Sequence, residues 1–384
     1  MTVQFIGTFP QKNWVSMAMF VLYIVARWSR VSRVPKHVFW IVIAMALGIP
    51  GGWGSGSPDD LWGPLSMSLA AVSVMGIFVA EFHHEEDLRL IAIVAVLALP
   101  FACYISIVRN GLDEQWTTGS RYGINLMGYF LNFACVYAMT MRTPYIFLSI
   151  FPMLLLTGSR TSAAATVITL LLYPRFTQLL AKKWLQIVLV IGILLTIGGF
   201  IFARQKNESF HNLMTPYSES MHHEERYTLD NIQASIMTRF SIAGGWFSYA
   251  IRHPTLFGHG IKTYSLVNEE ENIDFPHNGI LHVFNGLGIP AGIIYTVILL
   301  LVVKLYFEKR KTLSDQFSWA GAFFIGICSR MFTEAQLVVA LNHISGFLLC
   351  YGCGLAVFGL TSAASKPSAH KAQFQRKRRT SYRK

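Results

Sequence analysis

Residues 184–203 read WLQIVLVIGILLTIGGFIFA, and residues 204–213 continue as RQKNESFHNL. The first stretch has no charged side chain, and its length is what an α-helix needs to cross the roughly 30 Å hydrocarbon core of a bilayer. The second opens a polar segment that continues to residue 276. A membrane-spanning helix followed by a long polar loop is therefore the first prediction.

The composition extends this prediction to the whole chain. The 384 residues are 53% hydrophobic and only 14% charged, with a mean hydropathy of +0.43, whereas soluble domains carry about 25% charged residues. Helices are expected because each satisfies its own backbone polar groups in lipid. The predicted spans are 14–26, 38–50, 62–82, 89–107, 122–141, 144–158, 161–173, 184–203, 279–303, 316–331 and 337–360. The predicted fold is an all-α polytopic membrane protein with about 11–12 transmembrane helices and one long periplasmic loop.

The distribution of charge predicts the orientation. Eight of the 32 Lys and Arg residues follow Ser365, next to the last apolar segment. By the positive-inside rule this tail is cytoplasmic, so the long loop is expected on the non-cytoplasmic side of an inner membrane. The +12 net charge is thus interpreted as a membrane anchor, and no nucleic acid is expected as a partner. The predicted organisation is 1–203 N-terminal transmembrane helices, 204–278 periplasmic loop, 279–362 C-terminal transmembrane helices and 363–384 basic tail.

The long loop contains an amphipathic segment. Apolar residues recur mostly every three to five positions between Tyr227 and Ile251, which predicts one or two helices on the membrane surface. Pro254, Gly258 and Gly260 follow and are expected to end them.

Cysteines and histidines give no metal or cofactor prediction. All five cysteines lie in apolar stretches, including the C-x-x-C of Cys350 and Cys353, and are expected to be packing residues. The tetrapeptide HHEE occurs at 83–86 and at 222–225. The predicted topology places the two copies on opposite sides of the membrane, so each is interpreted as a solvated turn.

Two arginines stand out. Arg160 separates two apolar runs within LTGSRTSA (156–163), at a predicted periplasmic turn. A charge at such a depth is either functional or a snorkelling residue that caps a helix pair. Arg239 lies in the amphipathic segment, where a solvated surface charge is the simpler interpretation. If the segment packs beside Arg160, the two guanidinium groups would together bind the two phosphates of a lipid carrier.

Further candidates lie at predicted periplasmic helix ends. His277 closes the loop in FPHNGILH (275–282), where an imidazole is either structural or a general base or hydrogen-bond donor. Asn278 is expected to fix the turn. Arg121 and Arg330 are weaker candidates for lining the same cavity.

These residues form an ordered series of motifs. A Ser-Arg-Thr turn at 159–161 is followed by Thr-Arg-Phe-x₅-Trp-x₄-Ile-x₂-Pro-x₃-Gly-x-Gly at 238–260 and by Pro-His-Asn-Gly-Ile-Leu-x₄-Gly-Leu-Gly at 276–288. The series resembles the O-antigen ligase family of bacteria, which includes O-antigen polymerases and protein O-oligosaccharyltransferases. The resemblance covers roughly residues 120–305.

The resemblance implies a membrane glycosyltransferase of lipopolysaccharide biosynthesis. It implies transfer of a glycan from undecaprenyl diphosphate to a lipid A-core sugar at the periplasmic face, without a metal and with inversion. Arg160 and Arg239 match the pyrophosphate-binding arginines of the family, and His277 matches its essential histidine. A repeat-unit polymerase using the same donor remains open. A transporter or flippase is the alternative from another class, and it predicts charges along a path at mid-membrane.

Overall fold

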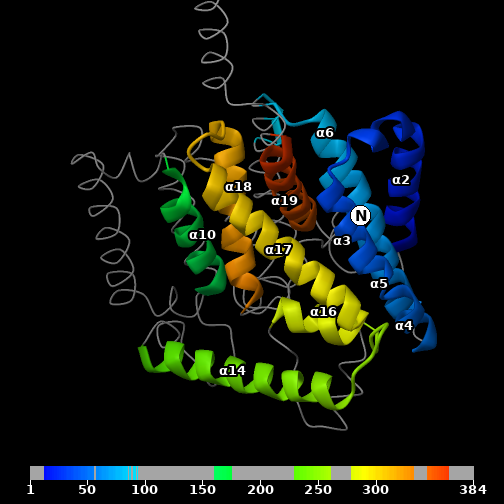
Figure 1. The fold of residues 1–384 in the computed structure, drawn as a ribbon, viewed down its shortest axis with the longest axis vertical. Helices are drawn as coiled ribbons and strands as arrows, with labels where there is room; N and C mark the ends of the chain where they lie inside the picture. The colour runs from blue at the N-terminus through cyan, green and yellow to red at the C-terminus, as the bar shows by residue number, and fades with distance from the viewer. Residues whose placement is uncertain are drawn as a thin grey trace, which may run out of the picture.

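The computed structural model describes residues 13–55, 58–84, 86–87, 90–91, 93, 160–174, 229–260, 278–332 and 344–362. All regular structure in these segments is helical (Figure 1). The first elements are α2 (Asn13–Ala26), η2 (Trp28–Arg33), α3 (Lys36–Ala46), α4 (Ile49–Gly54), α5 (Pro58–Ala70), η3 (Ala71–Phe78) and α6 (Val79–Glu81). The later elements are α10 (Arg160–Leu172), α14 (Leu229–Arg252), α16 (Gly279–Leu287), α17 (Ile289–Lys309), α18 (Asp315–Met331) and α19 (Ile344–Ser362).

Three stretches of the described residues are long and apolar enough to cross a bilayer: Lys36–Gly54, Leu61–Glu81 and Ile289–Lys309. They confirm the membrane-helix character that the composition indicated. The predicted number of about 11–12 spans stays a prediction, because the spans at 122–141, 144–158 and 184–203 lie outside the described residues.

One end of the bundle collects positive charge. The Glu81 carboxylate lies 3.6 Å from Arg27 and 3.5 Å from Arg30, and the Lys309 ammonium donates to the carbonyl of Leu360 at 2.7 Å. We call this end the basic end. It carries eight of the twelve Lys and Arg residues in the described segments. The eight are Arg27, Arg30, Arg33, Lys36, Lys304, Lys309, Arg310 and Lys311. The positive-inside rule associates such an excess with a cytoplasmic face.

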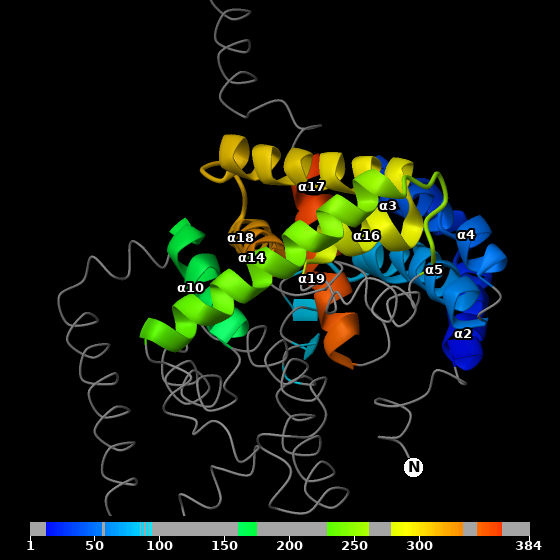
Figure 2. The same ribbon diagram turned by 90° about the horizontal axis from the view of Figure 1, so that it is seen from below.

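The opposite end is covered by α14, which runs across the bundle from the side of α10 to α16 (Figures 1 and 2). We call it the α14 end. It carries the other four arginines: Arg160, Arg239, Arg252 and Arg330. Exposed tryptophans mark both ends, with Trp28 69% exposed at the basic end and Trp53 76% exposed near the α14 end. Tryptophan is enriched at both membrane interfaces, so this placement fits a bundle that spans the bilayer.

The predicted single span 279–303 is wrong, because the chain breaks at Gly288 into α16 and α17. Gly288 has φ +98° and ψ 168°, a conformation open essentially only to glycine. Pro290 then starts α17, where its fixed φ and missing N–H are tolerated. The nine-residue α16 is too short to cross the membrane and lies at the α14 end, while α17 spans alone.

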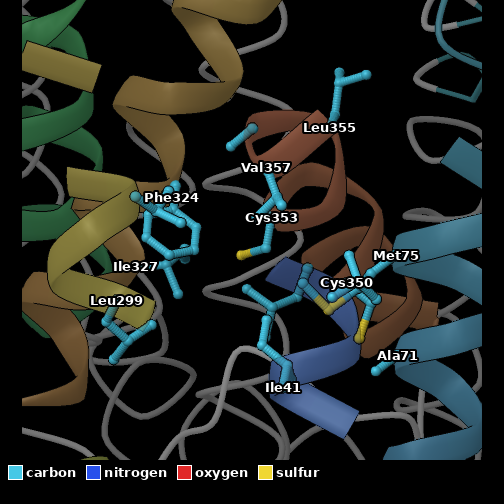
Figure 3. Packing of buried hydrophobic residues seen from close by; sticks show 14 of the residues in the cluster. Ile41, Ala71, Met75, Leu299, Phe324, Ile327, Cys350, Cys353, Leu355 and Val357 are labelled. Atoms are coloured by element: carbon cyan, nitrogen blue, oxygen red, sulfur yellow. The ribbon is translucent and has the colours of Figure 1, made fainter. Parts of the chain in front are cut away.

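Apolar side chains from α3, η3, α17, α18 and α19 form one core (Figure 3). Cys350 and Cys353 are fully buried in it, and Cys350 lies beside Met75 and Ala71 (Figure 3). This confirms these two cysteines as packing residues. The interpretation of residues 83–86 as a solvated turn is wrong for His83, whose half-buried ring lies 4.8 Å from that of Phe358.

Candidate functional site at the α14 end

The helix predicted in the loop is confirmed as one continuous element, α14, with two different faces. Ile242, Trp246 and Tyr249 follow one face and pack with Leu281 of α16, where Trp246 is only 1% exposed. The rings of Trp246 and Tyr249 meet edge to face at 5.7 Å. This face therefore attaches α14 to the bundle.

The other face of α14 is apolar but exposed. Met237, Phe240, Phe247 and Ile251 are 59–70% exposed and are three, seven and four residues apart, which places them on one side of the helix. Arg239 does not belong to this stripe. It precedes Ile242 and Trp246 by about one and two helical turns, which puts it on the bundle-facing side, and it is half-buried. Arg239 is thus held toward the bundle and not among the exposed apolar residues.

Residues 253–260 attach the C-terminal end of α14 to α16. His259 N–H donates to the carbonyl of Asn285 at 2.9 Å, and Gly260 N–H donates to that of Gly286 at 3.1 Å. Ile289 N–H donates back to the carbonyl of Thr255 at 3.0 Å. Three backbone hydrogen bonds therefore join the loop to the break between α16 and α17.

Glycine is required in this joint. A Cβ at Gly258, where φ is +77°, would lie 2.3 Å from the Gly286 carbonyl oxygen, and one at Gly288 would lie 2.2 Å from that of Leu256. The Gly-x-Gly and Gly-Leu-Gly of the sequence motifs thus dock on each other. The two motifs form one joint that fixes α14 to the bundle.

The first turn of α10 is positioned by α18. Ser162, Ala165, Thr166 and Thr169 are fully buried and recur at helical spacing. Their small side chains permit a close approach: a Cβ at Gly326 of α18 would lie 2.1 Å from the Thr169 hydroxyl oxygen. Small residues of this kind commonly bring membrane helices into contact.

Arg330, near the end of α18, reaches α10 directly. Its side chain is 1% exposed, and its Nη1 donates to the hydroxyl oxygen of Ser162, two residues after Arg160. A buried guanidinium is costly unless it is hydrogen-bonded. The Arg330–Ser162 contact therefore holds α18 to the turn that begins with Arg160.

Replacing Ser162 with alanine tests this contact. Ser162→Ala leaves the buried Arg330 with one partner fewer, and the expected loss of stability is about 1–3 kcal/mol. Thermal unfolding of the purified protein measures it. Ser329→Ala is the control, because that hydroxyl donates to Gly326 in its own helix, and its effect should stay within about 0.5 kcal/mol. Equal effects of the two variants would contradict the role of the contact.

Asn278 fixes the turn before α16, as predicted. It has extended backbone (φ −152°, ψ 114°), and its Oδ1 accepts hydrogen bonds from Ile280 N–H and Leu281 N–H at 3.0 Å each. Such a cap typically stabilises a helix start by about 1 kcal/mol. Its Nδ2 also lies 3.5 Å from the carbonyl oxygen of Phe332, just after α18. The position that follows His277 is thus tied to both α16 and α18.

His282, one turn into α16, is buried, and burial lowers its pKa to about 4. Its imidazole is therefore neutral near neutral pH and does not supply positive charge to the site. Two other candidates, His277 and Arg121, lie outside the described residues, and for Arg160 the description covers the backbone but not the side chain.

The fold and these elements define a class: a helical membrane protein in which a surface helix closes one end of the bundle. Within that class, the family model described as O-antigen ligase matches residues 145–296. The match runs through α10, α14 and α16 to the start of α17, and it supports the O-antigen ligase family that the motif series indicated. Among curated proteins, none matches the chain. The family implies a membrane enzyme of the O-antigen ligase or polymerase type.

Gly286 is part of the motif at 276–288 and Ser162 follows the Ser-Arg-Thr turn, but the sequence did not indicate which residues these two contact. Both act through residues distant in the chain: Ser162 contacts Arg330, and Gly286 contacts Gly258. The available signal was indirect, namely the run of small residues around Ser162 and the glycines that close each motif.

Proposed function

We propose that the chain transfers an O-antigen glycan from undecaprenyl diphosphate to a sugar of the lipid A core, at the periplasmic face of a bacterial inner membrane. The observation that carries the proposal is the arrangement of the α14 end. Arg160 begins α10, Arg239 lies on the bundle-facing side of α14, and Asn278 fixes the turn that follows His277. Three segments distant in the sequence thus bring polar residues to the same end.

The chemistry of the donor explains why arginines suit this site. A glycosyl diphosphate already has a good leaving group, so the enzyme mainly needs positive charge where negative charge develops on the diphosphate. In the proposal, the guanidinium groups of Arg160 and Arg239 bind the two phosphates, since guanidinium matches phosphate oxygens bidentately. A metal is then not required for that step, and the proposed reaction is inverting.

The acceptor hydroxyl needs a second set of groups. We assign His277 to orient or deprotonate this hydroxyl, or to hold a phosphate oxygen, because an imidazole titrates near working pH. In the proposal Asn278 contacts the substrate next to His277, and its hydrogen bonds with α16 and Phe332 hold this turn in place. Arg121 is proposed to line the cavity.

Arg330 acts on the proposed site through α10. Its guanidinium is buried against Ser162, so its effect on the substrate is through the position of the turn that begins with Arg160.

The charges of the described residues gather at the two ends of the bundle rather than along a path through it. This arrangement favours an enzyme over a transporter for a lipid-linked glycan.

The test uses a bacterial strain that lacks the gene and carries either the wild-type chain, Arg160→Ala or His277→Ala. With the wild type, long-chain glycan should appear on lipid A core. With either variant, core without glycan should remain while polymer accumulates on the lipid carrier. The measurements are gel analysis of lipopolysaccharide and mass spectrometry of carrier-linked glycan.

The same strains distinguish the ligase from the polymerase. If the strain without the gene makes lipopolysaccharide with a single repeat unit, the chain joins repeat units and the acceptor in the proposal is wrong. If both variants restore full-length product at the wild-type level, the assignment of Arg160 and His277 is wrong.

A further inference from the structure

The basic end contains a cavity that the proposed function does not use. It has a volume of about 320 Å³ and lies between α3, α17 and α19. Its polar lining consists of His37, Lys304, Glu308, Lys309 and Thr361, and its apolar lining is leucine. Cavities of this size bind small ligands or headgroups.

The polar wall favours an anion. Lys309 uses one of its three N–H donors on the carbonyl of Leu360 at 2.7 Å. Lys304 forms only a long, exposed ion pair with Glu308, at 3.8 Å, and such a pair adds little stability. Two lysines and one glutamate line the cavity, so positive charge exceeds negative charge around it.

His37 of α3 completes the polar wall. Its Nδ1 is closed to solvent while the side chain as a whole is half-buried, so a ligand in the cavity meets the exposed part of the ring. His37 is also the second residue of α3, whose cap residue Pro35 provides no side-chain hydrogen bond. The positive end of the helix dipole at this start adds to the attraction for an anion.

The apolar wall distinguishes a lipid from a free anion. Leu301 and Leu305 lie on α17 at one-turn spacing with Lys304 and Lys309, and Leu301 is 41% exposed. Lysines beside leucines at a helix end suit a headgroup at the interface and acyl carbons below it.

We propose that this cavity binds the phosphate headgroup of an anionic phospholipid. The headgroup phosphate accepts hydrogen bonds from Lys304 and Lys309 beside the His37 ring, and the first acyl carbons lie against Leu301 and Leu305. The bound lipid would join α3 to α17 and α19 at the end of the bundle away from α14.

The test is lipid binding to the purified full-length protein in detergent, measured by native mass spectrometry. Phosphatidylglycerol should bind about 25-fold more tightly than phosphatidylcholine with the same acyl chains, since two lysines at the cavity each contribute roughly fivefold. Lys304→Gln should weaken phosphatidylglycerol binding about fivefold. Because Lys304 is 70% exposed, this variant should fold normally.

Matched controls make the outcome decisive. Lys311→Gln removes the same charge from the exposed turn after α17, outside the cavity lining, and should change binding less than about twofold. Inorganic phosphate in excess should not displace the lipid. Displacement by phosphate would assign the site to a free anion and overturn the proposal. Equal binding of the two lipids, or equal effects of Lys304→Gln and Lys311→Gln, would also overturn it.

Discussion

Arg239→Ala is expected to lower glycan transfer by about 100- to 1,000-fold, the cost of removing one preorganised group that stabilises developing charge. Arg239 is half-buried on the bundle-facing side of α14, the side on which the proposal places the diphosphate. The measurement is the rate of transfer by the purified protein, with a lipid-linked glycan as donor and lipid A core as acceptor.

Two variants of the same helix sharpen this test. Arg252→Ala removes an equal charge from the exposed last turn of α14 and should change the rate less than about twofold. Arg239→Lys keeps the charge but loses the bidentate geometry, so an intermediate loss is expected. Equal losses for Arg239→Ala and Arg252→Ala would mean that α14 contributes only general positive charge, which contradicts the assignment of Arg239.

Gly288→Ala is expected to destabilise the protein by about 3 kcal/mol or more. A residue with a Cβ is strained at φ +98° and ψ 168°, by roughly 1–3 kcal/mol. In addition, the new Cβ would lie 2.2 Å from the Leu256 carbonyl oxygen and 2.8 Å from Gly258 N. These are backbone atoms held by the Ile289–Thr255 hydrogen bond, so they cannot move aside without undocking the loop. Thermal unfolding and protease cleavage within 253–260 measure the two effects.

Gly244→Ala is the control for that prediction. Gly244 lies inside α14 with nothing within 4 Å of an added Cβ, so alanine should stabilise the helix by about 0.5–1 kcal/mol. The two glycine substitutions are therefore expected to have opposite signs. A stable Gly288→Ala protein with an uncleaved loop would show that the joint does not need glycine at this position.

Local patterns predicted the features that depend on neighbouring residues. The amphipathic spacing predicted α14, and Asn278 was expected to fix its turn. The apolar run predicted a helix over 161–173, one residue away from the observed α10 at each end. Each of these depends on interactions within about one helical turn, which a sequence shows directly.

Features that depend on distant residues were not predictable in this way. The apolar run 279–303 has the composition of one span, and only the docking of residues 253–260 shows why it breaks at Gly288. Arg330 was expected to line a cavity, and its contact with Ser162 joins residues 168 positions apart. The periodicity of one segment cannot predict a contact between two residues so far apart in the sequence.

The joint between residues 253–260 and the break at Gly288 also limits how such proteins can be recombined. The loop and the α16–α17 break supply each other's hydrogen-bond partners, and neither tolerates a Cβ in the other's space. A chimera that exchanges only α14 and its loop with a relative would therefore inherit two mismatched halves. Exchange of residues 229–309 as one cassette keeps both halves of the joint together.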